Sequence, residues 1–150
     1  IQRIQTLYLL VAGIFPAISL FVPLVVFSEG ARWASMSAFG CESALVQELA
    51  GFHPYGLLVF TLFGIAEALY AIFGYKNRKS QIKKVYLTIV FNVIWYVALG
   101  AYTYSVSERI GLGYTFTTVL FAIIALIALF LALKGIRKDE ALVRAADRIR

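Results

Sequence analysis

Four long apolar segments constrain this chain more than any other feature of its sequence. They cover about residues 7–27, 54–75, 85–104 and 114–133, and none of them contains Lys, Arg or Asp. The hydrocarbon core of a bilayer is about 30 Å thick, and a helix needs roughly 20 apolar residues to cross it. We therefore predict an all-α fold: a polytopic membrane protein whose single domain, residues 1–150, is a bundle of four transmembrane helices.

The composition excludes several other classes of protein. Only 15% of the residues are charged and 61% are hydrophobic, whereas soluble domains carry about 25% charged residues. The net charge is +6, but the basic residues flank apolar segments as in membrane proteins, so we expect no nucleic-acid partner. A single cysteine, Cys41, excludes an intramolecular disulfide, and a single histidine, His53, excludes bis-histidine haem ligation within the chain.

The distribution of Lys and Arg predicts how the chain is oriented in the membrane. With four spans, both termini lie on the same side, and 12 of the 14 basic residues fall on that side; only Arg32 and Arg109 fall on the other. Because loops rich in Lys and Arg stay inside, we predict a bacterial inner-membrane protein with cytoplasmic termini. In this topology residues 28–53 form an outside loop, and residues 76–84 form a basic cytoplasmic loop.

The last residues, 136–150, are predicted to form a cytoplasmic amphipathic helix. Leu142, Ala145, Ala146 and Ile149 share one face of it. We favour a helix that lies along the anionic inner leaflet, and the alternative is a helix that docks a cytoplasmic partner. The expected surface for anionic lipids or a protein partner consists of Arg3, Lys76, Arg78, Lys79, Lys83, Lys84, Arg137, Lys138, Arg144 and Arg148.

Glu67 is the only carboxylate within the four spans. A charged residue at mid-membrane costs about 2.5–3.5 kcal/mol on insertion scales, so we expect an uncharged Glu67. Counted from the basic loop, Asn92 lies at nearly the same depth on the next helix, and the two side chains can form an intramembrane hydrogen-bonded pair. The pair has two interpretations, a contact that joins two helices or a proton-exchanging site. Ser19, Thr61 and Thr88 are further possible partners in the polar interior.

Three smaller features also bear on the interior. Pro16 is expected to kink the first helix or free a backbone carbonyl, which could line a cavity. Trp95 and Tyr96 lie deep enough to line a lipid or quinone pocket. Four alanines in the last span recur at helical spacing and predict a close-packed helix contact: Ala122, Ala125, Ala128 and Ala132.

The two ends of the chain resemble a known family. IQRIQTLYLL (residues 1–10) and IRKDEALVRAADRIR (residues 136–150) are similar to the opening and close of the bacterial "domain of unknown function 4293" family. The resemblance implies a small four-helix integral membrane protein and no established activity. It also suggests that the opening residues Gln2, Arg3 and Gln5 contact Asp147, Arg148 or their neighbours in one surface.

Together these features predict a non-enzymatic accessory or scaffold protein. Its partner would be a membrane protein complex, a second copy of the chain or anionic lipid. No Walker loop, HExxH, GxSxG or CxxC motif is present, and we expect no catalytic residues, cofactor or metal site. The alternative is a small transporter or channel-like protein that uses Glu67, and a membrane enzyme is the least favoured class.

Overall fold

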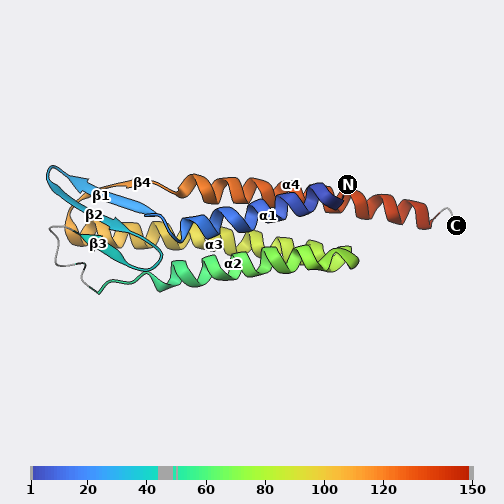
Figure 1. The fold of residues 1–150 in the computed structure, drawn as a ribbon, viewed down its shortest axis with the longest axis horizontal. Helices are drawn as coiled ribbons and strands as arrows, with labels where there is room; N and C mark the ends of the chain where they lie inside the picture. Colours follow the sequence, from blue (N-terminus) through green and yellow to red (C-terminus); the bar gives the residue numbers. More distant parts are fainter. Residues whose placement is uncertain (1, 44–48, 50, 149–150) are drawn as a thin grey trace.

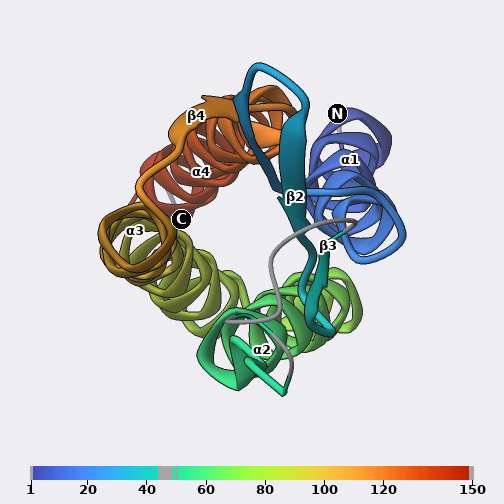
Figure 2. The same cartoon turned by 90° about the vertical axis from the view of Figure 1, so that its left-hand side faces the viewer.

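A computed structural model describes residues 2–43, 49 and 51–148. The described elements are α1 (Gln2–Ser19), β1 (Val25–Glu29), β2 (Arg32–Met36), β3 (Cys41–Ser43), α2 (Tyr55–Phe73), the 3-10 turn η2 (Gly74–Lys76), α3 (Arg78–Ile110), β4 (Gly113–Phe116) and α4 (Val119–Asp147). The four helices lie side by side along the long axis (Figure 1), around a common centre (Figure 2). The strands cover one end, which we call the sheet end; the opposite end is the basic end.

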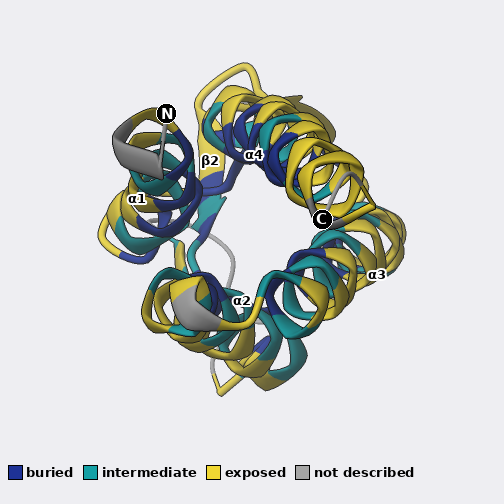
Figure 3. Ribbon diagram, turned by 90° about the vertical axis from the view of Figure 1, so that its right-hand side faces the viewer, coloured by how far each residue is buried: buried dark blue, intermediate teal, exposed yellow. Residues whose placement is uncertain are grey.

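Three of the helices are long and apolar enough to cross a membrane. Their spans are Tyr55–Phe73, Arg78–Ile110 and Val119–Ala146, whereas α1 contains a shorter apolar helix, Ile4–Ser19. Viewed from the basic end, buried residues face the centre and exposed residues face outward (Figure 3). Many of the exposed side chains are large and apolar, including Val59, Leu62 and Phe63, as expected for helices that contact lipid. These observations support a membrane protein built from helices.

The prediction of a purely all-α fold is wrong, because the connections between the helices at the sheet end form a sheet. Its four strands are antiparallel in the order β3-β2-β1-β4. The loop predicted at residues 28–53 contains β2, β3 and part of β1, while β4 comes from the connection between α3 and α4. Gly30 has φ +62° in the two-residue turn between β1 and β2, a conformation that tight hairpin turns require. The sequence between Ser43, a possible helix cap, and Gly51 also predicts a short helix at residues 44–50; of these residues the structure describes only Leu49.

The first helix ends earlier than its apolar segment suggests. α1 stops at Ser19, whose hydroxyl donates to the Pro16 carbonyl oxygen at 2.7 Å. The remaining apolar residues of segment 7–27 pass through Pro23 into β1, because β-branched Val25 and Val26 fit a strand. The predicted span therefore combines a helix and a strand that periodicity alone did not separate.

α2 lies within its apolar segment, whereas α3 and α4 are longer than theirs. α3 begins within the predicted basic loop, where the Asn77 side chain accepts from the Ser80 backbone N–H at 3.1 Å, and it ends before Gly111, which has φ +64°. α4 begins at Val119, after β4, and continues unbroken to Asp147. The predicted tail helix is therefore the last part of α4 and not a separate element.

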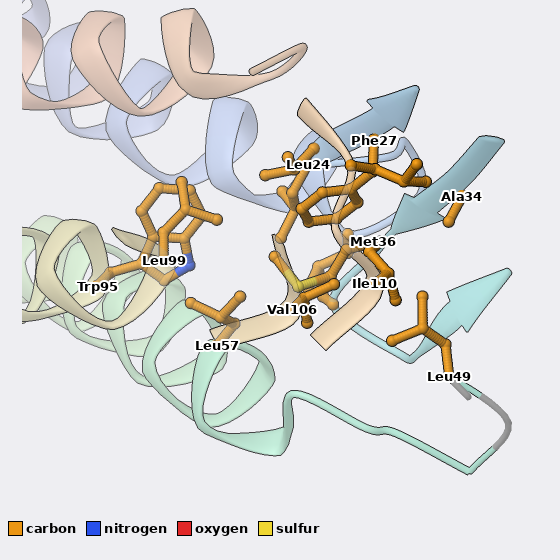
Figure 4. Close-up of a cluster of buried hydrophobic side chains, with 14 of the residues drawn as sticks. Leu24, Phe27, Ala34, Met36, Leu49, Leu57, Trp95, Leu99, Val106 and Ile110 are labelled. Carbon is orange, nitrogen blue, oxygen red and sulfur yellow. The ribbon is translucent and has the colours of Figure 1, made fainter. Parts of the chain in front are cut away.

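The described interior contains two apolar clusters. The first lies at the sheet end, where Leu24, Phe27 and Met36 pack against Leu57 and Val106 (Figure 4). The second lies toward the basic end and joins all four helices; its members include Leu9, Ala71, Val85, Leu129 and Ile136. The four predicted packing alanines of α4 are all buried, which confirms that they form a helix contact. Small residues of this kind let helix backbones approach closely.

Candidate functional site

The end of α4 projects beyond the rest of the molecule. Figure 1 shows its last turns extending past the N-terminus and past the join between α2 and α3. Every residue from 141 to 146 is exposed, including the apolar Leu142 (56%) and Val143 (44%). Glu140 and Arg144 form an ion pair of 2.5 Å along this segment, the i, i+4 spacing that supports an isolated helix. We call residues 140–148 the α4 arm.

The described members of the predicted basic surface lie around the base of the α4 arm and, for Arg144 and Arg148, on the arm itself. Lys79, Lys83, Lys138 and Arg148 are exposed. Four other members have partners. Arg144 forms the ion pair with Glu140. Arg78 donates to the Asp139 backbone oxygen at 3.0 Å, the Lys84 ammonium lies 3.3 Å from the centre of the Tyr70 ring, and Arg137 donates to the Tyr86 hydroxyl. The side chains of Arg3 and Lys76 lie outside the described part of the chain.

A buried hydrogen bond joins the opening of the chain to the start of the α4 arm. Gln5 Nε2 donates to Asp139 Oδ2 at 2.6 Å, and both side chains are buried. Gly135 lets α4 lie close to the Gln5 side chain, because a Cβ at this position would lie only 3.1 Å from Gln5 Cγ. The expected contact between the two ends therefore exists, but through Asp139; the Asp147 side chain lies outside the described residues. Asp139 was missed, although it follows Ile136 at helical spacing on the buried face of α4.

The predicted pair of Glu67 and Asn92 is not formed. Glu67 is half-buried. Along α2 it lies between Phe63, whose ring stacks on Phe91, and Tyr70, whose ring contacts the Lys84 ammonium. Among the described residues, no hydrogen bond or ion pair joins Glu67 to another side chain. Asn92 Oδ1 is buried and has no hydrogen-bond partner. Depth counted along the helices was therefore not sufficient to bring the two side chains together.

Asn92 instead lines a cavity at the centre of the helices. The cavity has a volume of about 20 Å³, is partly open to the surface, and is lined by Ala12, Pro16, Ser19, Phe60, Thr61, Gly64, Thr88, Phe91, Asn92, Trp95 and Ala122. None of these residues carries a charge, and Glu67 is not among them. Trp95 is 5% exposed, and its Nε1–H has no hydrogen-bond partner. The cavity therefore combines two unpaired polar groups with neutral surroundings.

Metal ligands do not gather in the part of the chain that the structure describes. No group of three or more His, Cys, Asp or Glu side chains comes together there. His53 Nδ1 lies 2.9 Å from the Phe39 backbone oxygen, and the His53 ring stacks on Tyr55. Cys41 is half-buried in β3, and burial raises the pKa of its thiol from 9.0 to about 11.

The comparisons with known proteins give a family without an assigned activity. No curated protein matches the chain. One family model, described as "Domain of unknown function (DUF4293)", matches residues 1–149. The match covers the four helices, the sheet and the whole α4 arm, so it extends well beyond the two terminal segments that carry the resemblance. The chain therefore belongs to the DUF4293 family of proteins of unknown function.

Proposed function

We propose that this protein is a non-enzymatic accessory or scaffold protein that anchors a partner protein to a membrane through the α4 arm. The observation that carries the proposal is the unbroken run of exposed residues from 141 to 146. A helical segment free of its own bundle on every side, with apolar Leu142 and Val143 exposed, is suited to lie in an apolar groove of another protein. The flanking Arg144 and Arg148 favour a groove with acidic edges.

The continuity of α4 favours a protein partner over the lipid surface. A separate tail helix could lie flat on the inner leaflet, but a segment continuous with a spanning helix keeps the direction of that helix. From Lys134 to Asp147 the helix rises roughly 20 Å, which carries Leu142 away from the bilayer. The exposed lysines at the base of the arm, Lys79 and Lys83, are better placed for anionic headgroups.

The proposed orientation places the α4 arm in the bacterial cytoplasm. The support is the distribution of charge, since all but two of the 14 basic residues flank the basic end or belong to it. Arg32 and Arg109 lie at the sheet end, which would then face the periplasm. Labelling of intact spheroplasts with membrane-impermeant and membrane-permeant maleimides tests this orientation, with Cys41 replaced by Ser and single cysteines placed at the exposed Ala141 or Ala31.

The alternative proposal, a small transporter or channel that uses Glu67, has less support. A transport path needs a polar route past the carboxyl group, and Glu67 does not line the central cavity. Its position between two aromatic contacts with α3 suits a residue of the helix interface. Proton flux into vesicles that is lost in Glu67→Gln would restore this alternative.

A pull-down from native membranes tests the scaffold proposal. The full chain with a cleavable tag is compared with the double variant Leu142→Gln and Val143→Gln, which removes the apolar anchors and keeps good helix formers. We expect a stoichiometric protein with the unaltered chain and at least about a tenfold loss with the double variant. The matched control is Ala141→Gln, also exposed on the arm, which should retain the partner. A partner that the double variant retains in full, or the lack of any stoichiometric partner, contradicts the proposal.

A further inference from the structure

We infer that the central cavity is a binding site for one neutral hydroxyl group. The inference starts from two groups on α3, Asn92 and Trp95, which lie three residues apart on one helix face and both line the cavity. Asn92 Oδ1 is an acceptor without a donor, and Trp95 Nε1–H is a donor without an acceptor. A hydroxyl group both donates and accepts, so it is a neutral group that can pair with either of them. A buried polar group without a partner costs about 1–3 kcal/mol.

The rest of the lining offers acceptors. The hydroxyls of Ser19, Thr61 and Thr88 donate their hydrogens to backbone oxygens of their own helices, at 2.7, 2.7 and 2.9 Å. Their oxygens therefore remain available to the cavity only as acceptors. Pro16 lacks an N–H, which leaves the Ala12 carbonyl without its usual helical partner. A ligand for this lining must donate at least one hydrogen bond.

The same groups exclude other classes of ligand. An anion would face a lining dominated by oxygen acceptors. A bare cation would face the positive hydrogen of Trp95 Nε1, and no carboxylate lines the cavity to balance its charge. An apolar molecule would leave Asn92 and Trp95 unpaired. A neutral O–H group is the class that fits all of these groups.

The cavity is so small that only the hydroxyl end of a larger molecule can enter it. A volume of about 20 Å³ holds about one water molecule, and its partly open side allows a chain to extend outward between the helices. Two sources supply such a group, an internal water molecule and the headgroup of a long-chain alcohol from the bilayer.

Tryptophan fluorescence can distinguish the alcohol from an apolar ligand. The chain has two tryptophans, so Trp33→Phe leaves Trp95 as the only one. The full chain in phosphatidylcholine nanodiscs is titrated with 2-bromododecan-1-ol, whose bromine quenches Trp95 when the hydroxyl end is bound, and with 2-bromododecane, which lacks the hydroxyl. Saturable quenching by the alcohol alone identifies a membrane alcohol as the source.

Three variants connect the signal to the cavity. Asn92→Leu removes the acceptor and should raise the half-saturating alcohol concentration about tenfold, equivalent to one hydrogen bond. Ala122→Leu fills the cavity without removing a polar group. It should also raise the half-saturating alcohol concentration, and it therefore tests the site if Asn92→Leu fails to fold. Thr103→Val is the matched control, because Thr103 also carries a buried unpaired oxygen on α3 but does not line the cavity.

Nitrogen-15 NMR of the Trp95 indole N–H tests whether an internal water molecule, the other source, supplies the hydroxyl group. A cross-peak between the Trp95 indole proton and bound water, present in the unaltered protein and lost in Asn92→Leu and Ala122→Leu, identifies water as the hydroxyl. Either source supports the inference. Equal quenching by the two bromo compounds, or neither saturable quenching nor a water cross-peak, overturns it.

Discussion

At the sheet end, Phe27, Met36 and Val106 are fully buried between strands and helix ends, whereas at the basic end Gln5 and Asp139 meet through a buried hydrogen bond. The strands carry exposed polar residues such as Glu29 and Arg32, so the hydrophobic effect stabilises the core beneath them. Helices in lipid lack this driving force and depend on close packing and polar contacts. The comparison indicates that strands close the core at one end, while the other end adds a buried polar contact to its apolar cluster and leaves α4 free to project.

The largest predicted effect is the loss of Phe27. Phe27→Ala should reduce the free energy of unfolding by about 3–5 kcal/mol, since Phe27 is fully buried in the sheet-end core and its removal leaves a cavity. Unfolding in detergent micelles followed by circular dichroism measures it. Phe39→Ala is the control: Phe39 is 52% exposed and should cost less than about 1 kcal/mol. Equal losses would show that the sheet end is not held by burial.

The second prediction concerns the reactivity of Cys41, beside the same core. Because burial raises the pKa of its thiol from 9.0 to about 11, the reactive thiolate fraction at pH 8 falls about 100-fold. Alkylation by iodoacetamide should therefore be about 100-fold slower than for a free thiol at pH 8, and its rate should keep rising until about pH 11. Mass spectrometry gives the rate, and no other cysteine interferes. A rate that levels off near pH 9 would contradict the burial of this strand.

The third prediction tests the polar contact at the basic end. Asp139→Ala leaves Gln5 Nε2 buried without its acceptor and should cost about 1–3 kcal/mol of unfolding free energy. Asp139→Asn keeps an acceptor oxygen and should cost less. Combining Asp139→Ala with Gln5→Ala measures the coupling, and additive single losses would show that the two side chains do not stabilise this end together.

Much of the helical part of the molecule was predictable from the sequence. The apolar segments predicted the helices, and the spacing of four alanines predicted the buried face of α4. The opening residue Gln5 was correctly expected to contact the tail. The described partner of Gln5 is Asp139, because the tail continues α4 and this position faces Gln5; the Asp147 side chain lies outside the described residues.

The sheet could not be predicted in the same way. β1 pairs with β4 across roughly 90 residues of chain, and such a contact leaves no local periodicity in either segment. Val25, Val26 and Phe27 continue an apolar run that a spanning helix would also show, so composition did not separate strand from helix. Only the pairing partner, supplied by the fold, decides that these residues form a strand.

The sequence by itself determined that this chain forms apolar helices, that its basic residues gather at one end, and that it belongs to a family of unknown function. The first two properties depend on composition and on spacing within single segments, and the third depends on the likeness of the chain to the family. The tertiary structure decided which polar groups meet. It separates Glu67 from Asn92 and brings Asn92, Trp95 and Pro16 from two helices around one cavity. The physical reason is that depth along a helix is set by counting residues, whereas the direction of a side chain is set by how the helices rotate and pack against one another.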